Sequence, residues 1–285
     1  MRHLTVLALL GSLGCANGPQ ADHTPPSAAS AHAPAEQTDN GSATGTPAAL
    51  SSASRSDVPV DASAIVAAAD RSPEDRALDA QRSPADLLAF TQLQPGMRVA
   101  DLAAGTGYTT ELLARAVGPS GQVYGQNSPF ILERFAEGPW SARLLKPVMG
   151  NVTRVDSEFD APLPGIDHLD RIVFVLFYHD TVWFKTDRSA MNRALLAALK
   201  PGGKLILVDH SAVPGAGVSH AKSLHRIEEP IVIQELEAAG FTLESSADFL
   251  RHPEDPRDWS ASPSTAGERR GQSDRFVLRF IKPTN

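Results

Sequence analysis

Five polar residues with acid–base or hydrogen-bonding side chains stand at the ends of two apolar segments of this sequence. They are Tyr178, His179, Asp180, Asp209 and His210. A histidine beside a carboxylate is suited to removing a proton, because the carboxylate orients the ring and the ring takes the proton. We predict that His179 or His210 is such a base. The adjacent Asp180 or Asp209 is predicted to orient it, the alternative being that each residue only caps a loop or bonds buried backbone.

A second polar group follows in the next connection along the chain, on the side of the molecule where these strand ends are expected. It contains His220, His225 and Arg226. The catalytic prediction is therefore His179, Asp180 and His210. Substrate contacts are predicted for Tyr178, Asp209, His220, His225 and Arg226.

A metal site is the alternative interpretation of the same residues. Two histidines and two carboxylates at neighbouring strand ends are suitable ligands for Zn²⁺ or a harder cation. Against this, His220 and His225 are five residues apart and do not share a helix face, and the sequence has no HExxH-type or cysteine-based spacing. The prediction is a site without metal.

A glycine-rich turn supplies a different kind of chemistry. Asp101 ends an apolar segment, and Gly105 and Gly107 stand between it and an amphipathic segment. Such a turn presents backbone N–H groups to a ligand, and glycine allows the ligand to come close. Alone the signal is weak, because short Gly-x-Gly turns also serve packing.

Alternating strand and helix signals position all of these residues. Strands are expected at 98–102, 122–125, 151–155, 171–177 and 204–209, and helices at 108–117, 130–145 and 181–199. Two capped helices are expected between residues 61 and 93, a further helix at 229–239, and two last strands within 241–249 and 275–283. This order predicts a parallel α/β sheet, whose ligands bind beyond the carboxyl ends of the strands.

Three segments resemble one family. "VADLAAGTG", "GPSGQVYGQN" and "LKPGGKLILVDH" are similar, in order and spacing, to the class I S-adenosylmethionine-dependent methyltransferases. "YHD", "VDH", "LHRIEE" and "EAAGF" more narrowly resemble a little-characterised group of predicted methyltransferases, several with leader peptides. The resemblance implies a Rossmann-like methyltransferase fold: a seven-stranded, mostly parallel sheet with the last strand antiparallel and helices on both faces.

The same resemblance implies S-adenosylmethionine as cofactor. In the family the acid and the glycines of the first loop hold the methionine moiety, and an acid after the second strand holds the ribose. Two positions depart from the family, since Asn127 stands in the place of that acid and Ala103 replaces the first glycine. The predicted cofactor residues are Asp101, Ala103, Gly105, Thr106, Gly107, Asn127 and Asp156, with Asp160 as the other candidate for the adenine edge.

Composition limits the partners. A net charge of -7 gives no basic patch for nucleic acid, so a small-molecule substrate is expected. Cys15 is the only cysteine, which excludes an intrachain disulfide and a thiolate metal cluster. The long loop between the last two strands, with Trp259, Arg269 and Arg270, is a candidate lid.

The N-terminal region predicts export. Residues 1–15 have a cation, a short apolar run and then Cys15, similar to a bacterial lipobox, although Ser12 stands where leucine is usual. Residues 16–60 are rich in Ala, Pro and Ser and are expected to form a disordered tether, and residues 61–285 the methyltransferase-like domain. Membrane contact through lipidated Cys15 and a cell-envelope or periplasmic location are predicted. A plain cleaved signal peptide, or a cytoplasmic protein with a mis-assigned start, is the alternative.

Two functions are consistent with these features. The first is a methyltransferase that acts on a small-molecule or lipid-like acceptor. The second is an envelope lipoprotein whose methyltransferase-like domain has been repurposed for ligand binding or for metal or His/Asp chemistry.

Overall fold

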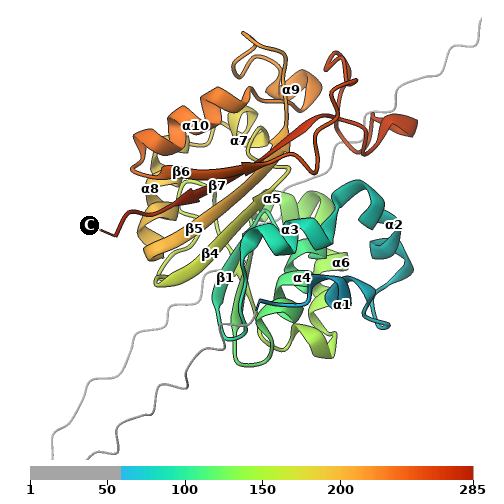
Figure 1. Ribbon diagram of the computed structural model, residues 1–285, viewed down its shortest axis with the longest axis vertical. Coiled ribbons are helices and arrows are strands. Elements are labelled where there is room, and N and C mark those ends of the chain that lie inside the picture. The colour runs from blue at the N-terminus through green and yellow to red at the C-terminus, as the bar shows by residue number, and fades with distance from the viewer. Residues whose placement is uncertain (1–58, 285) are drawn as a thin grey trace, which may run out of the picture. The chain divides into compact units, whose positions relative to one another are not determined.

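Seven strands form one twisted sheet in the computed structural model, which describes residues 59–284 (Figure 1). The strands are β1 (Arg98–Leu102), β2 (Gln122–Asn127), β3 (Val152–Asp156), β4 (Leu169–Val175), β5 (Leu199–His210), β6 (Thr242–Ala247) and β7 (Arg275–Ile281). Their order is β3-β2-β1-β4-β5-β7-β6, and only β7 runs antiparallel to its neighbours. The predicted fold class is confirmed.

Helices cover both faces of the sheet, with α3 and α4 on one side and α8 and α10 on the other (Figure 1). The α-helices are α1 (Ala62–Ala67), α2 (Pro73–Arg82), α3 (Pro84–Thr91), α4 (Tyr108–Val117), α5 (Pro129–Ile131), α6 (Glu137–Leu144), α7 (Asp180–Trp183), α8 (Arg188–Ala198), α9 (Ala221–Leu224) and α10 (Glu229–Ala238). Shorter turns are a π-helical η1 (Leu132–Ala136) and the 3₁₀ turns η2 (Pro147–Met149) and η3 (Gly267–Arg269).

Several expected helix boundaries were wrong. Three helices precede β1 instead of two, because Ser83 takes a left-handed conformation with φ 42° and Pro84 begins a new helix. The helix expected at 181–199 is two helices, since Lys185 has φ 58° and the Asp187 side chain caps α8 by accepting from the Ala190 N–H at 2.9 Å. The helix expected at 130–145 contains the π-helical turn η1.

The two central strands are mostly apolar and are buried over nearly their whole length. Within β1, Val99, Ala100 and Leu102 are buried, and within β4 the residues from Leu169 to Phe174 are buried. The strand order reverses direction between β1 and β4, so the crevice beyond their carboxyl ends is where a ligand of such a sheet binds. The glycine-rich turn follows β1, and the first His/Asp group follows β4.

The predicted leader (1–15), Cys15 and nearly all of the predicted tether (16–60) lie outside the described residues. No helix within residues 59–284 combines the length and the apolar character that a membrane crossing requires.

Candidate functional site

The turn after β1 has an unusual backbone that leaves room for a ligand. Ala103, Gly105 and Gly107 have φ values of 50°, 57° and 88°. A Cβ added to Gly107 would lie 2.7 Å from Cε3 of Trp140, so glycine is required there for packing. A Cβ on Gly105 would meet only the Ala103 carbonyl oxygen, at 3.9 Å, so this glycine faces open space.

Asn127, at the end of β2, holds this turn in place. Its Oδ1 accepts from the Gly105 N–H at 2.7 Å, and its Nδ2 donates to the Gly105 carbonyl at 3.1 Å. The side chain is fully buried and does not line the ligand cavity. Its predicted role at the ribose is therefore corrected: both ends of the amide are used by the loop backbone.

Asp101 and Arg82 are the acidic and the basic side chain on the wall beside the turn. Asp101 is buried and accepts from Thr110 Oγ1 at 2.6 Å, and burial raises the pKa of its carboxyl to about 7. The Arg82 guanidinium lies 4.8 Å from the centroid of the Tyr108 ring and has no salt-bridge carboxylate among the described residues. Burial lowers the pKa of Arg82, and both groups can be stabilised by a ligand that carries the opposite charges.

A cavity of about 690 Å³ extends from the turn across the ends of β4 and β5. The predicted site residues that line it are Asp101, Ala103, Gly105, Thr106, His179, Asp180, His210 and His225. Those that do not line it are Gly107, Asn127, Asp156, Tyr178, Asp209, His220 and Arg226. Aromatic side chains complete one wall: Phe135, Phe177, Trp183 and Phe184. The cavity volume is in the range of small-molecule sites.

His179 is held by two hydrogen bonds to one carboxylate, which also accepts a third from His210. Asp209 is fully buried, and it accepts from the His179 backbone N–H at 2.7 Å, from His179 Nδ1 at 2.7 Å and from the His210 backbone N–H at 2.8 Å. Because a carboxylate only accepts, the proton of the His179 ring lies on Nδ1 and Nε2 is left to face the cavity. Asp209 thus orients His179, as the sequence suggested, from behind the site and not from within it.

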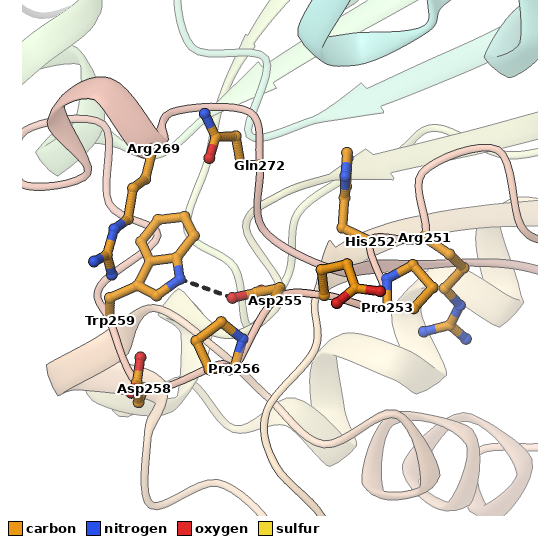
Figure 2. Close-up of a pocket in the computed structure, with 10 residues that line it drawn as sticks. Arg251, His252, Pro253, Asp255, Pro256, Asp258, Trp259, Arg269 and Gln272 are labelled. Atoms are coloured by element: carbon orange, nitrogen blue, oxygen red, sulfur yellow. Dashed lines mark hydrogen bonds between the residues drawn. The ribbon is translucent and has the colours of Figure 1, made fainter.

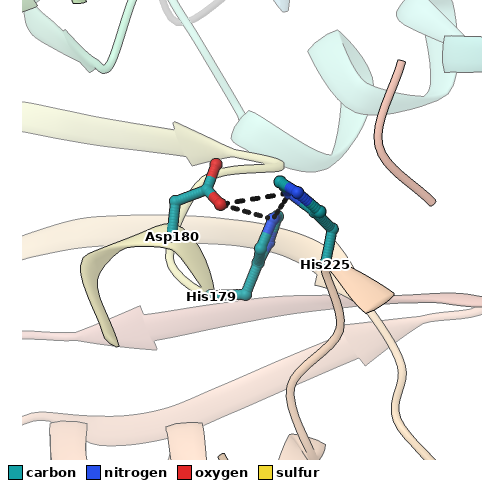
Figure 3. Close-up of side chains that lie close together, drawn as sticks. All are labelled: His179, Asp180 and His225. Atoms are coloured by element: carbon teal, nitrogen blue, oxygen red, sulfur yellow. Dashed lines mark hydrogen bonds and ion pairs between the residues drawn. The ribbon is translucent and has the colours of Figure 1, made fainter. Parts of the chain in front are cut away.

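Three side chains meet at the cavity end of this arrangement, as Figure 3 shows. His179 Nε2 lies 3.2 Å from Asp180 Oδ1 and 3.2 Å from His225 Nδ1, and His225 Nδ1 lies 3.1 Å from Asp180 Oδ1. Asp180 is the first residue of α7, and His225 follows α9 with φ 51°. A left-handed histidine is a strained conformation that a functional contact can explain.

Burial and charge act differently on the two histidines at the strand ends. For His179 burial opposes the charged form, but the carboxylates of Asp209 and Asp180 outweigh it and raise the pKa to about 10. For His210 burial, together with the nearby charge of His179, lowers the pKa well below its usual value. The His210 ring also shares a hydrogen bond between Nδ1 and Ser273 Oγ at 2.8 Å.

Two predicted substrate contacts lie elsewhere. The Tyr178 hydroxyl donates to Glu235 Oε2 at 2.7 Å and accepts from Asn192 Nδ2 at 2.8 Å, on the side of α8 and α10. Tyr178 therefore does not line the cavity, whereas the next residue, His179, does. Arg226 is fully buried and pairs with Asp255 at 2.8 Å, which makes it a structural residue.

Three further predicted residues lie away from the cavity. Asp156, at the end of β3, is paired with Arg154 at 2.8 Å. Asp160 accepts from the Asp187 N–H at 2.7 Å and caps the segment before α8. His220 has a buried Nδ1 without a partner among the described residues, but it does not line the cavity.

The loop between β6 and β7 reaches the cavity, as expected of a candidate lid. It contributes Ala261, Ser262, Pro263, Ser264 and Arg270 to the lining. Trp259 instead faces a separate hollow of about 480 Å³ within the loop, where its indole N–H donates to Asp255 at 2.7 Å (Figure 2). Arg269 lies 5.7 Å from the centroid of the Trp259 ring. The tryptophan therefore anchors the loop, and Arg270 is its charged residue at the site.

Comparison with known proteins agrees with this architecture. Residues 58–134 match the family model of protein-L-isoaspartate(D-aspartate) O-methyltransferase. The ubiquinone/menaquinone biosynthesis C-methyltransferase UbiE of Shewanella woodyi is 36% identical over 119 residues, which are 41% of this chain and 44% of that protein. UbiE of Ectopseudomonas mendocina is 31% identical over 166 residues, 58% of this chain and 59% of that protein. These matches support the predicted resemblance to the class I S-adenosylmethionine-dependent methyltransferases.

The chain spans only about half the length of these curated relatives. Among solved structures, a SAM-dependent methyltransferase from Aquifex aeolicus has a TM-score of 0.52 at 19% identity, over 78% of this chain and 99% of that one. The [4+2]-cyclase SpnF has a TM-score of 0.50 at 18% identity, over 72% of this chain and 83% of that one. At such identities the likeness establishes the fold alone.

S-adenosylmethionine is the cofactor that the similarity to methyltransferases implies, and the turn after β1 fits it. Gly105 leaves the close approach that a nucleoside–methionine ligand needs. Asp101 and Arg82, which has no salt-bridge partner within residues 59–284, match the ammonium and carboxylate of its methionine end. Sequence reasoning missed Arg82 and the aromatic wall, because neither has a motif and both are assembled by the fold.

Proposed function

We propose that this methyltransferase transfers the methyl group of S-adenosylmethionine to a small-molecule acceptor with an apolar body, bound in the same cavity. The observation that carries the proposal is the continuous cavity of about 690 Å³, which joins the glycine turn to the His/Asp cluster. When bound, the cofactor supplies a methyl group already activated by its sulfonium. The chain therefore has to align the two ligands, exclude water and move a proton.

The glycine turn and the charged wall hold the cofactor in this proposal. Asp101 binds the ammonium of the methionine end, and Arg82 binds its carboxylate. The ammonium and the carboxylate of the cofactor would thereby stabilise the charged forms of Asp101 and Arg82, which burial disfavours.

The other half of the cavity holds the acceptor. Phe135, Trp183 and Phe184 provide an apolar surface, which favours an acceptor with an aromatic or lipid-like body. Arg270 and the serines of the β6–β7 loop cover it. His210 lines the cavity beside His179 and is the candidate group to take the acceptor's proton, with Ser273 fixing its ring.

We also propose an envelope location, which the leader-like residues 1–15 and Cys15 support. A lipidated Cys15 would anchor the N-terminus, and the segment before residue 59 would connect it to the domain.

Titration calorimetry of the full chain with S-adenosylhomocysteine tests the cofactor site. We expect a 1:1 complex, and Arg82→Met should weaken it by 10- to 100-fold, about 1.4–2.7 kcal/mol, because a charge-assisted contact is lost. Arg76→Met is the matched control, since Arg76 lies on the same helix and is exposed. Equal affinities of the Arg82 and Arg76 variants would refute the role of Arg82.

A further inference from the structure

His179, Asp180 and His225 bring three ligand atoms to one point of the cavity wall. The atoms are His179 Nε2, Asp180 Oδ1 and His225 Nδ1, and they form a nearly equilateral triangle with sides of 3.2, 3.2 and 3.1 Å. The three residues come from two segments, with His225 far along the chain from the other two, so the fold assembles the triangle (Figure 3). All three line the cavity.

The size of the triangle matches a metal coordination face. A tetrahedral Zn²⁺ bound at about 2.0–2.1 Å by nitrogen and oxygen keeps its ligand atoms about 3.3 Å apart. The observed sides are within a few tenths of an ångström of that value. One ion can therefore contact all three atoms with only small movements of the side chains.

The hydrogen bonding around the triangle favours a cation. The Nδ1 proton of His179 is committed to Asp209, so Nε2 is the ring nitrogen that faces the other two atoms and that a cation would bind in place of a proton. A carboxylate behind a metal-binding histidine is the usual second partner of such a ligand, because it fixes the ring and raises its basicity. Asp209 is fully buried and does not line the cavity, so it can support His179 but cannot itself bind the ion.

The left-handed backbone of His225 is consistent with a ligand. Its φ of 51° costs free energy for a residue with a side chain, and it turns Nδ1 toward His179 and Asp180. The local sequence does not explain this conformation, because neither His225 nor the following Arg226 is a glycine.

We propose that His179, Asp180 and His225 bind one divalent transition-metal ion, with Zn²⁺ the best match, and that its open coordination position faces the cavity. Two histidines and one carboxylate with a free position are also a set that binds Fe²⁺. The free position takes an oxygen ligand, either water or the hydroxyl of an acceptor. Binding of an acceptor hydroxyl to the ion rests on the proposed methyl transfer. Binding of the ion itself does not depend on that function.

Metal titration of the full chain tests the site. Protein treated with a chelator and dialysed is titrated with Zn²⁺, and in parallel with Co²⁺, whose visible absorption reports tetrahedral coordination by nitrogen and oxygen. We expect His225→Gly to weaken the tightest Zn²⁺ binding by more than about 100-fold, because loss of a supporting partner alone costs 10- to 100-fold. The tetrahedral Co²⁺ spectrum should disappear in this variant.

His168→Gly is the matched control. His168 is an exposed histidine with a left-handed φ of 54°, so glycine changes its backbone in the same way as at His225. Asp180→Asn provides a second variant that keeps the shape of the side chain and should also lose the ion. Thermal melting of every variant shows whether it is folded.

The outcomes separate this site from the proposed function. Equal Zn²⁺ affinity of wild type, His225→Gly and Asp180→Asn would overturn the metal site, even if histidines outside the described residues bind Zn²⁺. S-adenosylhomocysteine binding should persist in His225→Gly, since the glycine turn is intact. A failure of cofactor binding in wild type would contradict the methyltransferase proposal and leave the metal result standing.

Discussion

Asp101→Asn is a substitution whose effect on stability should change with pH. Burial raises the pKa of Asp101 from 3.8 to about 7. Because each pH unit between the two values is worth about 1.4 kcal/mol, the ionised carboxyl destabilises the cofactor-free fold by about 4 kcal/mol. Asparagine keeps the oxygen that accepts from Thr110 and removes the charge.

The sign follows from proton binding. Between pH 4 and 7 folded Asp101 holds its proton while the unfolded chain has lost it, so this group's contribution to stability falls as pH rises. Well above pH 7 both the folded and the unfolded chain have lost this proton, and the destabilisation by the ionised carboxyl is complete. The Asn variant has no such group, so its advantage over wild type should be near zero at pH 4 and approach about 4 kcal/mol at pH 8.

Chemical denaturation of both proteins at pH 4, 6 and 8 measures this difference, and Asp167→Asn, at an exposed carboxylate, is the control. A difference in unfolding free energy that stays constant from pH 4 to pH 8 would refute the buried-carboxyl argument. Although Asp101→Asn should stabilise the fold, it should weaken binding of S-adenosylhomocysteine, because the ammonium of the ligand loses its counter-charge.

Three further substitutions test other parts of the structure. Gly107→Ala should lower the unfolding free energy by roughly 2–4 kcal/mol, measured in urea, because the new Cβ overlaps Trp140 in a left-handed backbone. Arg226→Ala should cost about 3–5 kcal/mol in the same assay, since it leaves the buried Asp255 carboxylate without its arginine counter-charge; a loss below 1 kcal/mol would contradict that pairing. Cys15→Ser should move the protein from the membrane to the soluble fraction and abolish incorporation of labelled fatty acid, and an unchanged membrane fraction would refute lipidation.

The sheet could be predicted from the sequence because its signals are local. The limits of β1 and α4 agree with the expected ranges, since each has an unbroken apolar pattern and a glycine boundary. The helix boundaries near Ser83 and Lys185 were missed, because left-handed residues other than glycine leave no clear mark in a sequence.

The site was predicted less completely, for a physical reason. Strand ends place His179 and His210 at the same edge of the sheet, but which side chain faces the cavity depends on packing behind it. Tyr178 turns to Glu235, and Asn127 turns to Gly105, because each finds a hydrogen-bond partner there. Such partners come from distant parts of the chain, so only the assembled fold reveals them.

The meeting of His179 with His225 shows the same limit. The spacing of histidines along the sequence argued against a metal site, because His220 and His225 do not share a helix face. The fold instead joins His225 to residues after β4, and the triangle that results has no sequence motif. A search restricted to motifs therefore misses it.

Calorimetric titration of the full chain with S-adenosylmethionine and S-adenosylhomocysteine tests the central claim most directly. We expect both ligands to bind one per chain and Arg82→Met to weaken both, while Arg76→Met does not. Absence of binding of either ligand at millimolar concentration, by a chain shown to be folded, would contradict the claim that this cavity is a methyltransferase site.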